Sequence, residues 1–137
     1  MPRLPLLFLS AAATCLVAGV CLGMAMGMAH DFHLAPVHAH INLVGWTSLS
    51  LMGLTYRAYP QLTVARVPAL AQFALSAGAA FAFPFGIYLA IEHESPGLAI
   101  GAGTVFLAGA VLFLARLVPL VLSKAPASRQ TALLAAE

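Results

Sequence analysis

Apolar residues run along this chain in four long stretches that are separated by short polar segments. The stretches cover residues 4–28, 35–58, 68–91 and 96–122. A helix rises about 1.5 Å per residue and a hydrocarbon core is about 30 Å thick, so each stretch is long enough to cross a bilayer. Within lipid, the backbone must pair all its polar groups internally, which favours helices. The pattern predicts an all-α membrane protein with four transmembrane helices.

The composition supports this prediction. Of the 137 residues, 62% are hydrophobic and only 7% are charged, whereas soluble domains carry about 25% charged residues. We expect a single transmembrane domain over residues 1–137, with a short polar tail at 123–137 and no separate soluble domain. The chain has no glycine-rich phosphate loop and no basic patch of the kind that nucleic acid requires, so we expect no nucleic-acid partner.

The charged residues and the histidines separate to opposite sides of the predicted membrane domain. Four crossings place both termini and the 59–67 loop on one side. This side carries every lysine and arginine, namely Arg3, Arg57, Arg66, Arg116, Lys124 and Arg129. The other side carries His30, His33, His38, His40 and His93 together with Asp31, Glu92 and Glu94. By the positive-inside rule both termini are cytoplasmic, and we expect a bacterial-type inner membrane with the histidines facing the periplasm.

Two histidines stand two residues apart at the start of the second apolar stretch, in APVHAHINLVGW. If this segment is helical, His38 and His40 point about 200° apart and serve different faces. If residues 35–40 are extended, the pair could instead converge with His30 and His33 on one metal. Small residues such as Gly45 keep the helix thin and leave space for a flat macrocycle beside an axial ligand. Ionisable groups within a membrane are costly, which favours a functional role.

The segment VHAHINLVGWTSLSLMGLTYRAYP resembles a helix of the catalytic subunit of the haem–copper oxidase superfamily, which includes cytochrome c oxidase subunit I and the nitric oxide reductases. In the oxidases a His-x-His pair on one helix binds two haems, and a Met-Gly pair and a proline follow. Met52-Gly53 and Pro60 stand at the corresponding places relative to His40. A His-x-Asn motif on another helix of the reductases is similar to His40 and Asn42.

This resemblance implies a b-type haem, with His40 as the best candidate ligand, His38 as the second, and Asn42 and Gly45 beside it. The large subunit of the family has twelve helices in three arcs of four. A chain of four helices would resemble one arc, and three copies would form a closed ring. We therefore expect a homotrimer with haem between neighbouring copies.

The sequence also departs from the family. It has no arginine where the family holds the haem propionates, so His30, His33 or backbone N–H groups at the start of the second helix would have to serve. The copper-site histidines and the tyrosine cross-linked to one of them have no match. We therefore expect electron transfer or binding of a gas or of haem itself, with an electron-transfer partner on the outer side, and no oxygen reduction.

A copper or zinc site on the histidine side is the alternative. The segment GMAMGMAHDFH places Met24, Met26 and Met28 before His30 and His33, and thioether with imidazole suits copper. The segment IEHES adds the second group of ligands, Glu92, His93 and Glu94, on the same side. A histidine with carboxylates is also a common zinc ligand set.

The first apolar stretch contains two patterns that concern packing. Gly19, Gly23 and Gly27 recur at a spacing of four, which leaves one helix face bare enough for close approach of another helix. That face could pack within the chain or against a second copy. Cys15 and Cys21 are too far apart along one helix for a disulfide, so we expect both to be core residues.

Overall fold

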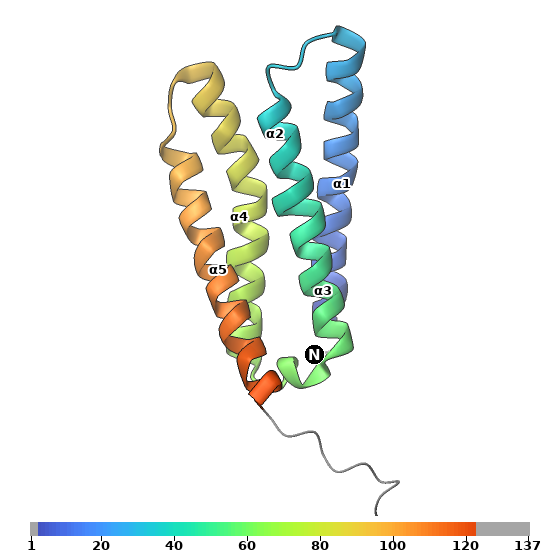
Figure 1. Cartoon of the computed structure of the whole chain (residues 1–137), viewed down its shortest axis with the longest axis vertical. Coiled ribbons are helices and arrows are strands. Elements are labelled where there is room, and N and C mark those ends of the chain that lie inside the picture. The colour runs from blue at the N-terminus through green and yellow to red at the C-terminus, as the bar shows by residue number, and fades with distance from the viewer. Residues whose placement is uncertain (1–2, 123–137) are drawn as a thin grey trace, which may run out of the picture.

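The computed structural model describes residues 3–122, and this part of the chain is almost entirely helical (Figure 1). The tail at 123–137, with Lys124, Arg129 and Glu137, lies outside the described residues. The elements are α1 (Leu4–Ala29), α2 (Ala35–His40), the π-helix η1 (Ile41–Ser48), α3 (Leu49–Ala58), the short 3-10 helix η2 (Pro60–Thr63), α4 (Arg66–His93) and α5 (Gly97–Leu122). The elements α2, η1 and α3 follow one another without a break and form one rod.

Three of the helices, α1, α4 and α5, are long and apolar enough to cross a membrane. The helical fold that the apolar stretches predict is confirmed, and three such helices fit a membrane protein. That the rod at 35–58 forms a fourth crossing stays a prediction. Helix α4 begins at Arg66, two residues before the third apolar stretch. Pro68 lies within the first turn, where its missing N–H would have had no partner within the helix.

The helices form two antiparallel pairs (Figure 1). In the first pair α1 lies against η1 and α3, and in the second α4 lies against α5. We call the end with the α1–α2 and α4–α5 connections the histidine end. The opposite end, which carries the N-terminus and η2, is the terminal end.

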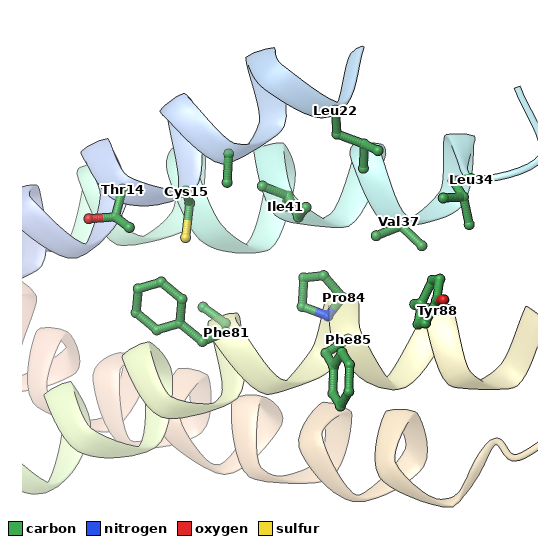
Figure 2. A pocket seen from close by; sticks show the side chains of 12 residues that line it. Thr14, Cys15, Leu22, Leu34, Val37, Ile41, Phe81, Pro84, Phe85 and Tyr88 are labelled. Atoms are coloured by element: carbon green, nitrogen blue, oxygen red, sulfur yellow. The ribbon is translucent and has the colours of Figure 1, made fainter. Parts of the chain in front are cut away.

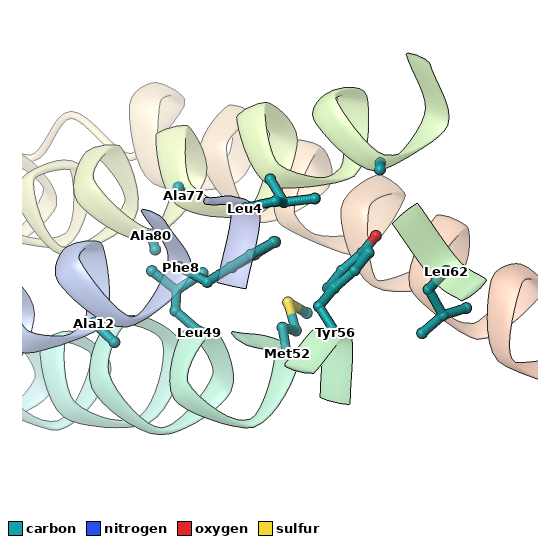
Figure 3. Close-up of a cluster of buried hydrophobic side chains, with 10 residues drawn as sticks. Leu4, Phe8, Ala12, Leu49, Met52, Tyr56, Leu62, Ala77 and Ala80 are labelled. Atoms are coloured by element: carbon teal, nitrogen blue, oxygen red, sulfur yellow. The ribbon is translucent and has the colours of Figure 1, made fainter. Parts of the chain in front are cut away.

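The buried core joins the two pairs toward the terminal end (Figure 3). Phe8 of α1 stacks on Tyr56 of α3, with ring centroids 5.4 Å apart, and meets Phe73 of α4 edge-on at 4.9 Å. Leu4 and Leu49 are fully buried beside them. Because large side chains fill this region, the terminal end holds the two pairs together by apolar packing.

The second pair depends on glycine for its close approach. A Cβ added at Gly86 of α4 would lie 2.5 Å from the backbone nitrogen of Ala99 in α5. A Cβ at Gly109 of α5 would lie 2.6 Å from the Ser76 hydroxyl of α4. Because Gly86 and Gly109 have no side chain, α4 and α5 can approach each other closely at both positions.

A fully buried polar side chain, Gln72 of α4, also links the two pairs. Its Nε2 donates to the Ser76 hydroxyl at 3.0 Å and lies 3.1 Å from the Met52 sulfur of α3. Its Oε1 has no hydrogen-bond partner. An unpaired buried carbonyl oxygen lowers the free energy of unfolding. This cost offsets the stabilisation from the two contacts that Nε2 makes.

We expect Gln72→Leu to leave the free energy of unfolding unchanged or to raise it by about 1 kcal/mol, because it removes the unpaired oxygen and keeps the volume. Gln72→Ala should lower it by about 2 kcal/mol, because it leaves a cavity. Unfolding of the protein in mild detergent, followed by circular dichroism as SDS is added, measures both. A loss in Gln72→Leu as large as in Gln72→Ala would contradict the prediction.

Candidate functional site

The two histidines of the second apolar stretch lie on α2, which begins with Pro36 in its first turn. Because residues 35–40 are helical, the rings leave the helix in different directions. His38 contacts α1, and His40 contacts α4. The expectation of different faces is confirmed. The alternative, an extended segment that converges with His30 and His33 on one metal, is wrong because the segment is helical.

His38 is held between α1 and α2. Its Nδ1 donates to the carbonyl oxygen of Gly19 at 2.9 Å, and its Nε2 lies 3.5 Å from the amide nitrogen of Asn42. That same amide nitrogen donates to the backbone carbonyl of His38 at 2.9 Å. The ring fits because Gly23 has no side chain: a Cβ there would lie 2.8 Å from the ring Cε1. Both nitrogens of His38 thus have neighbours within the chain.

The glycine face of α1 packs within the chain. A Cβ at Gly19 would lie 2.6 Å from the Asn42 amide nitrogen, and Gly23 meets His38, whereas Gly27 has nothing within 4 Å. Of the two possibilities that the glycine spacing left open, contact within the chain holds at Gly19 and Gly23. The spacing of these glycines predicts a close approach but does not identify the histidine and asparagine that they accommodate.

Gly45 also faces α1, and this corrects an expectation. A Cβ at Gly45 would lie 2.6 Å from the Cβ and Sγ of Cys15. The space beside Gly45 is therefore filled by α1, and a macrocycle has no room there. Cys15 is buried as expected, whereas Cys21 is exposed and is not a core residue.

His40 has a different environment. Its Nδ1 lies 2.7 Å from the carbonyl oxygen of Pro36, one turn earlier. Because a carbonyl only accepts, Nδ1 carries the proton and the lone pair of the neutral ring is on Nε2. Nε2 makes no hydrogen bond within the described residues 3–122. The ring stands nearly perpendicular to that of Phe83 in α4, with centroids 5.0 Å apart. Metal-ligating histidines commonly show this arrangement, with one nitrogen bound to a carbonyl and the other free.

The π-helix η1 begins directly after His40 and covers Ile41–Ser48. The Ser48 hydroxyl donates to the carbonyl of Leu43, five residues earlier, at 2.8 Å. Segments of π-helix are rare and occur often at functional sites. This element could not be predicted from the sequence, because the residue types of the segment are also compatible with an α-helix.

The expected metal ligands at the histidine end do not assemble around one point. His33 lies between two carboxylates, with Nδ1 2.9 Å from Asp31 and Nε2 2.8 Å from Glu92. His93 instead contacts the Tyr88 ring, and His30 follows α1 in a left-handed backbone conformation. Residues 3–122 contain no group of three or more His, Cys, Asp or Glu that could hold a metal ion. The ligands of the alternative copper or zinc site, His30, His33, Glu92, His93 and Glu94, are therefore not grouped around one point in the described residues.

The hydrogen bonds to Asp31 and Glu92, in that order, raise the pKa of His33 above its ordinary value. The backbone N–H of His33, followed by its ring, lowers the pKa of Asp31. His33 is thus engaged by two carboxylates, and its role toward haem propionates stays a prediction.

Of the methionines in the alternative copper site, Met26 is buried while Met24 and Met28 are exposed.

An apolar cavity of about 400 Å³ lies between α1, α2 and α4 (Figure 2). Leu22 of α1 and Val37 of α2 form one wall, and Phe81, Pro84 and Tyr88 of α4 form the other. Neither His38 nor His40 lines it. The cavity and the free imidazole nitrogen are therefore separate features of the fold.

Comparison with known proteins adds no assignment, since no family model, no curated protein and no solved structure matches the chain. The resemblance to the haem–copper oxidases rests on the segment at 37–60 alone.

Proposed function

We propose that the chain is a haem-binding integral membrane protein in which Nε2 of His40 ligates a b-type haem near the outer membrane face. The observation that carries the proposal is the hydrogen bond from His40 Nδ1 to the Pro36 carbonyl at 2.7 Å. This bond selects the tautomer with a free Nε2 lone pair and fixes the ring before any ligand arrives. A free imidazole lone pair within an apolar chain is what a haem iron requires.

His40 is a better ligand candidate than His38. The His38 ring fills the gap left by Gly23, and its Nε2 faces the Asn42 amide. A haem iron would have to displace that amide and separate α1 from α2. We therefore assign His38 and Asn42 to holding α2 against α1, so that the His40 end of the helix stays in place.

The surroundings of His40 fit an apolar cofactor. Phe83 limits rotation of the imidazole and contributes an apolar edge. A haem iron ligated by histidine changes between the ferrous and ferric states or binds a diatomic gas, which supports electron transfer or gas binding. With His33 engaged by carboxylates, His30 and the backbone N–H groups at the start of α2 remain for the propionates.

The proposal extends to assembly and orientation. The rod at 35–58 would form the fourth crossing, with the arginines in the cytoplasm and the histidine end at the periplasmic side of an inner membrane. Since His38 is engaged with α1, a second axial ligand would come from another copy. A closed ring of three copies, as the oxidase resemblance implies, would supply it.

The experiment is an absorbance spectrum of the protein in mild detergent, oxidised and then reduced with dithionite, with metal analysis of the same sample. We expect a Soret band with sharp reduced bands in the wild type and their loss in His40→Ala. His93→Ala is the matched control, because His93 is an exposed histidine at the same end whose ring contacts that of Tyr88 and not α2. It should keep the haem.

Circular dichroism and thermal unfolding must match between His40→Ala and the wild type freed of haem, because bound haem itself would stabilise the wild type. Titration with added hemin tests whether the variant can still bind it. A colourless wild type that carries copper or zinc and binds no hemin would overturn the proposal. Light scattering of the detergent complex tests the trimer separately.

A further inference from the structure

The two helix pairs are joined differently at their two ends. Toward the terminal end they share the buried core, and at the histidine end the apolar cavity lies between them. One side-chain polar contact crosses this gap: His33, in the α1–α2 connection, meets Glu92 near the end of α4 at 2.8 Å. In the histidine half of residues 3–122, no other side-chain hydrogen bond or ion pair joins the two pairs.

This contact lies beside the end of the cavity that Leu34 and Tyr88 line, and we call this end the mouth of the cavity. Leu34 directly follows His33, Tyr88 lies one helical turn before Glu92, and both side chains line the cavity (Figure 2). A movement of α4 away from the α1–α2 connection would therefore widen the cavity at this end. The contact therefore joins the α1–α2 connection to α4 at this end of the cavity.

The contact depends on a proton. The two ring nitrogens of His33 each face a carboxylate oxygen, at 2.9 Å for Asp31 and 2.8 Å for Glu92. An ionised carboxylate only accepts hydrogen bonds, so both nitrogens must donate, and this requires the imidazolium form. A neutral ring donates from one nitrogen and turns a lone pair toward the other carboxylate.

We propose that His33 is a pH-sensitive clasp: when protonated it ties the α1–α2 connection to α4 and closes the mouth of the apolar cavity, and when neutral it releases α4. The inference concerns the cavity and holds with or without haem at His40. The raised pKa of His33 gives the sign. The clasp is complete below the ordinary histidine pKa of 6.5 and is lost as the pH rises through the raised pKa.

The groups that face His33 are Asp31 from its own connection and Glu92 from α4. At the histidine end of the described chain, α1 is followed by His30, which forms no ion pair, and α5 contributes no titratable side chain. His93 and Glu94, next to Glu92, form no ion pair either.

The test measures the distance across the mouth by double electron–electron resonance in full-length protein in nanodiscs. Spin labels are placed on cysteines introduced at the exposed Phe32 and Ile91 after replacing Cys15 and Cys21 with alanine. We compare about pH 5.5 with about pH 8.5, on either side of the ordinary histidine value. The wild-type distribution should be narrow at the lower pH and should become broader and longer at the higher pH.

Two variants should abolish the pH response in opposite ways. His33→Ala should show the long, broad distribution at both pH values. Glu92→Gln should show the short one at both, because an amide can donate to a neutral ring nitrogen or accept from it. His93→Gln is the matched control and should behave as the wild type. A wild type that does not respond to pH, a response that survives in His33→Ala, or one that His93→Gln abolishes would overturn the proposal.

Discussion

Gly86→Ala is expected to force α4 and α5 apart and to lower the free energy of unfolding by about 2–3 kcal/mol, the cost of overpacking a close contact. The added Cβ would lie 2.5 Å from the backbone nitrogen of Ala99 and 2.7 Å from its Cα. These are backbone atoms near the start of α5, so a rotamer change cannot relieve the contact. The helices must separate, and apolar packing along the pair is lost.

Gly78→Ala is the matched control, because it makes the same change in the same helix at an exposed position with nothing within 4 Å. It should raise stability by about 0.5–1 kcal/mol, since glycine within a helix is less favourable than alanine. Unfolding by SDS in mild detergent, followed by circular dichroism, compares the two variants. Equal losses in both would show that α4 and α5 do not approach as described.

Gly23→Ala is expected to displace the His38 ring and to lower the free energy of unfolding by about 1–3 kcal/mol. The new Cβ would lie 2.8 Å from Cε1 of a ring that is already bound to the Gly19 carbonyl. Because a side chain can move more easily than a backbone, we expect a smaller loss than at Gly86. If the haem proposal holds, the affinity for hemin should fall as well, since α2 shifts with His38.

Two further variants isolate this contact. Gly27→Ala lies one turn along the same face, has nothing within 4 Å, and should be tolerated. In the double variant Gly23→Ala/His38→Ala the obstructing ring is gone, so the combined loss should be smaller than the sum of the single losses. Unfolding free energies of the four proteins give this coupling. Strict additivity would contradict the contact between Gly23 and His38.

Most of the helical layout could be predicted from the sequence because it follows from the lengths of the apolar stretches. Residues 4–28 correspond to Leu4–Ala29 and residues 96–122 to Gly97–Leu122. Prolines near the starts of the helices help to fix their positions. A stretch this apolar has few alternatives to a helix, so its existence does not depend on knowing its neighbours.

The details of the site could not be predicted because they depend on contacts between helices. The 200° separation of His38 and His40 follows from the chain itself, but the Gly19 carbonyl that binds His38 lies on another helix. Gly45 illustrates the error that results. In the sequence, Gly45 indicates space for a cofactor beside the second helix. In the fold, Cys15 of α1 fills that space. A glycine shows that something approaches closely and does not show what approaches.

The clasp residues show a similar limit. The sequence indicates both His33 and Glu92 as candidate ligands of the alternative metal site, because histidine and glutamate are common metal ligands. Their actual relation depends on which ring nitrogen faces which carboxylate, and that follows from the backbone between Asp31 and His33. Spacing in the sequence cannot distinguish ligands that share one ion from groups that share one imidazole.

The π-helix has a consequence for how this chain tolerates changes in length. The backbone hydrogen bonds of the π-helix at Ile41–Ser48 join residues five apart, whereas those of an α-helix join residues four apart. The π-helix therefore holds one more residue in each hydrogen-bonded turn. Deleting a single residue there would allow the segment to close as an ordinary α-helix while the helices on either side keep their present faces. The same deletion within α4 or α5 would rotate everything beyond it by about 100° and turn buried side chains toward lipid. The segment that follows His40 is thus where homologues one residue shorter could retain the same packing.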